Sequence, residues 1–289
     1  MTGGAPRDHR GELFAALQRL LPQHSLSRLL GRLAESQRPG LKNWLIRQAI
    51  ARYGIDLRDA QYPDIADYPS FNHFFTRALK PGARPLDDDA EALISPADGA
   101  ISQLGPIRDG DIFQAKGHAF STASLLGLDA NRTARFDRGA FATVYLSPRD
   151  YHRVHMPYPG RLLETLYVPG RLFSVNDTTA RHIPGLFARN ERLVCLFETD
   201  RGLMAVVLVG ALFVAGIRTV WRDDYRPGQC HREVFAEPRH FARGEELGQF
   251  RFGSTVVLVT ENPVDHCPAL THGSGVRMGE RLGTWAGEG

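Results

Sequence analysis

The sequence predicts an α+β protein with a helical amino-terminal lobe followed by a β-rich body. Apolar side chains recur at helical spacing through residues 11–54. From about residue 91, short runs of Val, Leu and Phe are separated by Gly, Pro, Asp or Asn, which is typical of strands. The stretch between them, residues 55–90, is rich in Pro, Asp and Gly and reads as a partly irregular connection. We therefore expect two parts, a lobe of residues 1–54 and a β-rich catalytic domain of residues 55–289.

Three helices are expected in the lobe. The first carries an apolar stripe ended by Pro22, the second has Ser25 as its candidate cap, and the third runs from about residue 41 to 53 before a Gly54 stop. Apolar faces flanked by arginines suit either ordinary packing on a core or attachment to a membrane surface. Both interpretations stay open here. The side chains that define the faces are Leu13, Phe14, Leu17, Leu20, Leu21, Leu26, Leu29, Leu30, Leu33 and Trp44.

Strands are expected at residues 141–146, 193–197, 204–209 and 256–260. The longest uncharged apolar stretch, residues 203–217, is shorter than the roughly 20 residues that a spanning helix needs. It is also Val-rich and interrupted by Gly210 and Gly216, which favours two buried strands. We therefore do not expect a transmembrane helix.

Composition narrows the classes of function. The chain has 289 residues, 43% hydrophobic and 23% charged, with a net charge of +3, which fits a soluble globular protein and gives no sign of nucleic-acid binding. Residues 1–50 alone carry eight Arg or Lys against three Asp or Glu, a local charge of +5. The three cysteines are scattered and no signal-peptide core opens the chain, so a reducing cytoplasm is expected, without a disulfide framework or a zinc ribbon.

The most informative feature is the step Gly253-Ser254-Thr255, just before a Val-rich run. A serine hydroxyl can attack the carbonyl of the glycine behind it, because a residue without Cβ tolerates the bent geometry. The resulting ester can eliminate and leave a pyruvoyl group, a ketone that accepts electrons in a decarboxylation. The commonest meaning of such a tripeptide is a turn that enters a strand, so other segments must decide.

Two other segments carry candidate chemistry. Asp98 lies in the turn Ser95-Pro-Ala-Asp-Gly99, which is either an ordinary Asp-Gly turn or the site of a carboxylate that orients a histidine. His152 and His155 are three residues apart, a spacing that could pair metal ligands, although Pro148, Pro157 and the lack of a His-Glu-x-x-His pattern argue against it. If this segment is extended, the two imidazoles face opposite ways and have separate roles.

Together these segments supply an Asp, a His and a Ser, the set that deprotonates a hydroxyl nucleophile. A serine hydrolase would use the same set, but Ser254 has no Gly-x-Ser-x-Gly elbow and leads into a strand instead of a helix. A non-enzymatic membrane-binding module is the other alternative.

The chain resembles the pyruvoyl-dependent phosphatidylserine decarboxylases of proteobacteria. The Tyr-His-Arg-Val-His-Met-Pro and Gly-Ser-Thr segments are the specific part, and the matches run in order over roughly residues 70–260. Phe252 stands where this family often has Leu, and Phe120 where a Tyr is common. The matching stretches are residues 74–80, 84–85, 95–99, 116–117, 125–127, 145–157, 168–170, 172–176, 187–192 and 244–255.

The resemblance implies a self-processing triad of Asp98, His155 and Ser254. It implies cleavage between Gly253 and Ser254 into a β chain, residues 1–253, and an α chain, residues 254–289. The pyruvoyl group made from Ser254 would form a Schiff base with the amine of phosphatidylserine, and the product would be phosphatidylethanolamine. The chain has only three lysines, none in an evident cofactor motif, which favours this route over pyridoxal phosphate.

The remaining expectations concern His152 and the membrane. An ordinary pKa of about 6.5 makes His152 a candidate proton donor to the substrate carbon, and a contact to the substrate phosphate is equally open. We expect peripheral attachment to the anionic cytoplasmic face of the cell membrane through the lobe, and the resemblance allows a homodimer.

Overall fold

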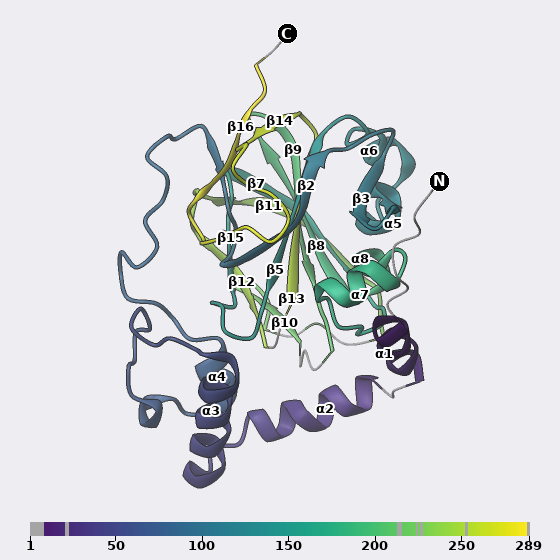
Figure 1. Cartoon of the computed structure of the whole chain (residues 1–289). Coiled ribbons are helices and arrows are strands. Elements are labelled where there is room, and N and C mark those ends of the chain that lie inside the picture. Colours follow the sequence, from purple (N-terminus) through teal and green to yellow (C-terminus); the bar gives the residue numbers. More distant parts are fainter. Residues whose placement is uncertain are drawn as a thin grey trace.

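The computed structural model describes residues 9–20, 23–212, 216–223, 225, 228–251 and 254–287. Its helices lie mostly in the first 75 residues and along one side of a β body (Figure 1). The predicted α+β class is confirmed. The helices are α1 (His9–Leu20), α2 (Gln23–Ala34), α3 (Pro39–Tyr53), α4 (Phe71–Phe75), α5 (Thr122–Leu126), α6 (Ala130–Ala134), α7 (Asp177–His182) and α8 (Leu186–Arg189), with a 3-10 turn at Ile65–Asp67.

The body is built on an eight-stranded antiparallel sheet of order β11-β7-β8-β9-β13-β5-β2-β15, beside smaller sheets β1-β16-β14, β10-β12-β6 and β3-β4. The strands are β1 (Ala92–Ile94), β2 (Gly99–Pro106), β3 (Asp111–Ala115), β4 (His118–Ser121), β5 (Ala140–Leu146), β6 (Arg153–His155), β7 (Gly160–Val168), β8 (Arg192–Thr199), β9 (Gly202–Val209), β10 (Ile217–Thr219), β11 (His231–Phe241), β12 (Glu246–Phe250), β13 (Ser254–Thr260), β14 (Val264–His266), β15 (Gly275–Val276) and β16 (Arg281–Trp285).

Strand β13 lies inside the large sheet, between β5 and β9. Val256 and Leu258 belong to the core on one face, whereas Val257 and Val259 belong to the core on the other. A strand buried on both faces has no place for alternating polar residues, which explains its continuous Val-rich run. The four strands expected from the sequence are present as β5, β8, β9 and β13.

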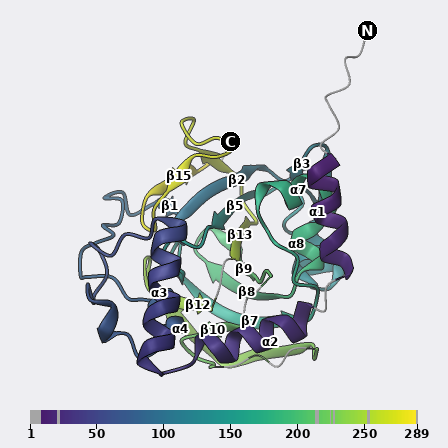
Figure 2. The ribbon, with the colours of Figure 1, turned by 60° about the horizontal axis from the view of Figure 1, so that its bottom comes forward.

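The three amino-terminal helices lie at one end of the body, and a view onto that end shows α1, α2 and α3 along its rim (Figure 2). Gly54 ends α3 in the left-handed region, with φ of +66° and its N–H bonded to the Ile50 carbonyl, as predicted. None of the helices in the described ranges is long and apolar enough to cross a bilayer.

The expected start of the second helix was wrong. Helix α2 begins at Gln23, two residues before Ser25. The Gln23 side chain donates to the Gln18 carbonyl and accepts from the Leu172 N–H, so tertiary contacts fix the start of the helix. The Gln18 side chain likewise accepts from the Ser174 N–H. The helices are therefore bound to the body, and a division at residue 54 stays a prediction.

Candidate active site

Ser254 is the first residue of β13 and pairs with Leu146 of β5. It is 0% exposed, and its Oγ has no hydrogen-bond partner among the described residues. The same holds for the hydroxyl of Thr255. Gly253 and Phe252, which complete the predicted cleavage step, lie outside the described residues. A buried hydroxyl without a partner costs about 1–3 kcal/mol, so its presence in a packed core calls for a functional reason.

The histidine segment is tied to the strand that precedes the predicted cut. Strand β6, which contains His155, pairs with β12, and the Phe250 N–H donates to the His152 carbonyl over 3.0 Å. The segment is extended at Arg153–His155, which is the condition under which the two imidazoles are expected to have separate roles. The two imidazoles have different neighbours, as expected for side chains with separate roles.

The His155 imidazole is held at both nitrogens. Its Nδ1 lies 2.9 Å from the Gly244 carbonyl oxygen and its Nε2 lies 3.0 Å from the Tyr151 hydroxyl. A carbonyl can only accept, so Nδ1 carries the proton and Nε2 accepts from Tyr151. Burial lowers the pKa of His155 below its ordinary value. At neutral pH the group is therefore a neutral base with its lone pair on Nε2.

His152 is fully buried against the ring of Phe75, with ring centroids 4.1 Å apart. Its Nδ1 donates to the Asp150 carbonyl over 2.8 Å, and its Nε2 has no partner among the described residues. Burial, together with the nearby charge of Arg77, lowers the pKa of His152 to about 3. The near-neutral pKa expected from the sequence is therefore wrong for this state, because the sequence does not reveal that the ring is shielded from water.

Asp98 does not hold His155 directly. Its carboxylate accepts from Arg84 through Nε at 2.9 and 3.1 Å and through Nη2 at 2.6 Å, and from the Met278 N–H at 2.9 Å. Among the described residues no hydrogen bond joins Asp98 to His155, whose two ring nitrogens are already bonded elsewhere. The expected direct contact is therefore absent, although the charge of Asp98 is among the influences that raise the pKa of His155 against the larger effect of burial.

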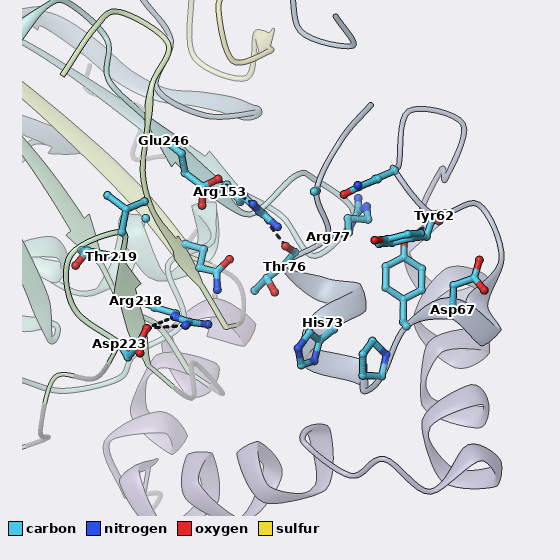
Figure 3. Close-up of a pocket in the computed structure, with 17 residues that line it drawn as sticks. Tyr62, Asp67, His73, Thr76, Arg77, Arg153, Arg218, Thr219, Asp223 and Glu246 are labelled. Carbon is cyan, nitrogen blue, oxygen red and sulfur yellow. Dashed lines mark hydrogen bonds and ion pairs between the residues drawn. The ribbon is translucent and has the colours of Figure 1, made fainter. Parts of the chain in front are cut away.

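Two open cavities lie beside this segment. One of about 450 Å³ is lined by Asp98, Asp150 and Tyr151, so the Asp98 turn and Tyr151, the partner of His155, face the same cavity. The other, of about 620 Å³, lies between residues 61–78 and the strands β6, β10 and β12. Figure 3 shows Arg153 and Glu246 on its strand side, and Tyr62 and Asp67 on the opposite side.

Tyr151, Arg84 and the Gly244 carbonyl were not singled out by the sequence. Tyr151 and Arg84 do lie in stretches that match the resembled family, which is the one signal that could have found them. Gly244 also begins a matching stretch, but the sequence does not show that its backbone carbonyl binds a histidine. No group of three His, Cys, Asp or Glu side chains in the described part of the chain is arranged to hold a metal ion.

Comparisons with known proteins show the family to which the chain belongs. A family model described as phosphatidylserine decarboxylase matches residues 71–284, and a second, described as PSD, matches residues 13–54. A phosphatidylserine decarboxylase proenzyme of Ectopseudomonas mendocina is 56% identical over 280 residues, covering 94% of this chain and 97% of the relative. Proenzymes of the same description from Alcanivorax borkumensis and Bordetella avium are 52% and 53% identical, covering 96% and 94% of this chain and 98% and 95% of the relatives.

Proposed function

The chain belongs to the phosphatidylserine decarboxylase family, and from that premise we propose that it is a proenzyme that cuts itself between Gly253 and Ser254 and then converts phosphatidylserine into phosphatidylethanolamine. The observation that carries this proposal is the Ser254 hydroxyl, fully buried and without a partner at the first residue of a central strand. The two products would be residues 1–253 and residues 254–289.

In the proposed cut, Ser254 Oγ attacks the Gly253 carbonyl carbon while its proton passes to a neutral imidazole. His155 fits the role of base, since the Gly244 carbonyl fixes the tautomer with its lone pair on Nε2. The Tyr151 hydroxyl donates to this lone pair in the structure, so Ser254 Oγ would have to replace Tyr151 at Nε2 before the proton passes. Asp98 would act on His155 indirectly, because it lines the same cavity as Tyr151, the partner of His155, and is itself held in place by Arg84. The ester then loses the Ser254 α-proton and its carboxylate leaving group, and hydrolysis with loss of ammonia leaves the pyruvoyl group.

Position 254 fits such a group. It would become the amino terminus of the α chain at the start of β13, in a buried setting next to the unpartnered Thr255 hydroxyl. When present, a pyruvoyl group supplies a ketone conjugated to an amide, which accepts the electron pair released as the substrate carboxylate leaves. A buried site excludes water from this chemistry.

We assign proton transfer at the substrate carbon to His152 Nε2. This nitrogen is buried and free of partners, while the Asp150 carbonyl fixes the tautomer from the other side of the ring. Because its pKa is lowered, His152 must take up a proton before it can give one back. A neutral imidazole has only a lone pair at Nε2, which cannot hold a phosphate oxygen but can take up the proton that is later returned to the substrate carbon.

Intact mass spectrometry of freshly expressed protein tests the cut. The wild type should give two chains, with the α chain lacking a free α-amine, whereas Ser254→Ala, His155→Ala and Asp98→Asn should stay one chain. His152→Ala should cleave at least in part yet decarboxylate poorly, and the exposed His240→Ala should match the wild type. One intact chain in active wild-type enzyme would disprove the proposal, and labelling by a serine-directed phosphonate would then indicate a hydrolase.

We further propose that residues 1–54 attach the enzyme to the cytoplasmic face of the membrane. The lobe exposes large apolar side chains, including Leu29 and Trp44, each 56% exposed, with Phe14, Leu17 and Leu33. Together with the local charge of +5, these suit an anionic bilayer surface, where each Lys or Arg contributes about 1 kcal/mol.

Vesicle co-sedimentation tests the attachment. A truncation near residue 55 also removes the contacts of Gln18 and Gln23 to the body, so point variants are cleaner. Leu29→Ser/Leu33→Ser and Trp44→Ser should weaken binding to anionic vesicles severalfold, in a salt-sensitive way. Val234→Ser, which removes a 64% exposed apolar side chain on β11, should not. Equal binding of all variants to the vesicles would mean that the three helices only pack on the body and do not attach the enzyme to the membrane. Sedimentation without vesicles tests the homodimer.

A further inference from the structure

Arg77 is a buried cation with unused donors. It follows α4, is 4% exposed, and its Nη2 donates to the carbonyls of Arg149 at 3.0 Å and Asp150 at 3.4 Å. Its Nε and Nη1 are buried and have no partner among the described residues. Burying a guanidinium without an anionic partner is unfavourable, and burial accordingly lowers its pKa. This points to an anion that is bound in the working enzyme.

Arg77 lies on the wall common to both cavities beside the site. The other arginines that face the larger cavity already have carboxylate partners: Arg153 is paired with Glu246 at 2.8 Å and Arg218 with Asp223 at 2.6 Å. In the smaller cavity Arg84 is paired with Asp98. Arg77, which Figure 3 shows in the larger cavity, differs from these three in having no carboxylate partner among the described residues: it donates to two carbonyls and lies over the ring of Phe74.

One short loop connects Arg77 to the reacting residues. The Asp150 carbonyl that accepts from Arg77 also accepts from His152 Nδ1. The Asp150 carboxylate accepts from the N–H and Oγ of Ser147, each at 2.7 Å, and Ser147 directly follows Leu146, the strand partner of Ser254. Residues 147–152 therefore link Arg77 through hydrogen bonds to His152 and to the end of β5, the strand that pairs with Ser254.

We propose that Arg77 binds the phosphodiester group of phosphatidylserine. This deepens the proposed function and rests on it. In the serine head group only two carbons and an oxygen separate the reacting amine from the phosphorus, so a phosphate subsite must lie close to position 254. Arginine suits this task because it is always charged and offers several donors in a rigid plane.

The phosphate is favoured over the carboxylate by the chemistry of the reaction. An ion pair to the carboxylate is strongest in the ground state and weakens as carbon dioxide forms, so it would raise the barrier. An ion pair to the phosphate is unchanged through the reaction and binds substrate and product alike. Arg77 would therefore contribute to binding of both lipids.

The test uses the processed full-length enzyme and a short-chain, soluble phosphatidylethanolamine, which has the phosphate and lacks the carboxylate. Arg77→Met should still be cleaved, as intact mass would show, and should bind this product at least tenfold more weakly in titration calorimetry. Its kcat/KM for short-chain phosphatidylserine should fall at least tenfold, mainly through KM. Arg77→Lys should be intermediate. Arg218→Met, from the same cavity, should bind product like the wild type.

The outcomes separate the alternatives. Unchanged product binding with a raised KM would place Arg77 at the carboxylate and overturn the proposal, and unchanged values for both would exclude it from binding. If Arg77→Met fails to fold or to process, Arg77→Lys decides, because wild-type product binding by the processed Lys variant would equally overturn it. Failure of the wild type to cleave or decarboxylate would instead refute the proposed function.

Discussion

Removal of the Ser254 hydroxyl should stabilise the uncleaved precursor. The comparison is His155→Ala against His155→Ala/Ser254→Ala, so that both proteins remain one chain. The hydroxyl is fully buried without a partner, and such a group costs about 1–3 kcal/mol. Loss of one oxygen leaves roughly 10 Å³ of space, which costs only about 0.2 kcal/mol. The net gain should be about 1–3 kcal/mol.

Differential scanning calorimetry measures this gain as a shift in Tm. For a chain of this size about 2 °C per kcal/mol is expected, so the double variant should melt about 2–6 °C higher. Thr260→Val in the same strand is the matched control, because its hydroxyl donates to the Asn262 carbonyl at 2.8 Å and its loss should lower Tm. An equal or lower Tm for the double variant would mean that Ser254 is hydrogen-bonded in the precursor, and the argument from an unpartnered nucleophile would fail.

Three further predictions concern the groups around the site. Arg84→Met should release Asp98 and slow self-cleavage at least tenfold in a gel time course. The control Arg135→Met, which breaks an exposed pair with Glu261, should cleave like the wild type. Equal cleavage rates for the two variants would show that Arg84 has no part in processing. The base in the cut must be neutral, and burial lowers the pKa of His155. Cleavage of precursor made by cell-free translation should therefore stay fast from pH 8 to below pH 6.5 and decline only in more acid solution. A decline already at pH 7 would contradict the assignment of His155 as the base. His152 has a pKa of about 3 in the folded protein and an ordinary value of about 6.5 in the unfolded chain, so it leaves stability unaffected above pH 6.5. Between pH 6.5 and 3 it lowers the free energy of unfolding by up to about 1.4 kcal/mol per pH unit, because only the unfolded chain takes up the proton. In a Ser254→Ala background, His152→Gln should therefore show a shallower loss of Tm over that range.

The sequence predicted local features well because they depend on neighbouring residues. The Gly54 stop follows from backbone conformation, and strand β13 follows from a Val-rich run that is buried on both faces. The site was predicted less well because its geometry depends on distant segments. Asp98 is bound by Arg84, and His155 is held by a carbonyl from residue 244. The lowered pKa of His152 comes from its burial, and the ring that packs against it, Phe75, lies 77 positions away in the chain, which no local pattern reveals.

The location of the proposed cut explains how one chain can become two without losing its fold. The proposed cut comes directly before Ser254, the first residue of β13, which pairs in the large sheet with β5 and β9, whereas the preceding strand β12 pairs in the small sheet with β6 and β10. A break between two sheets leaves both ladders complete. The α chain would keep β13 paired with β5 and β9, β15 paired with β2 and β16 paired with β1, so four backbone ladders would join it to the β chain. The chain can therefore place its nucleophile at the edge of the central core, because the hydrogen bonds that hold that core together lie on either side of the bond that is broken.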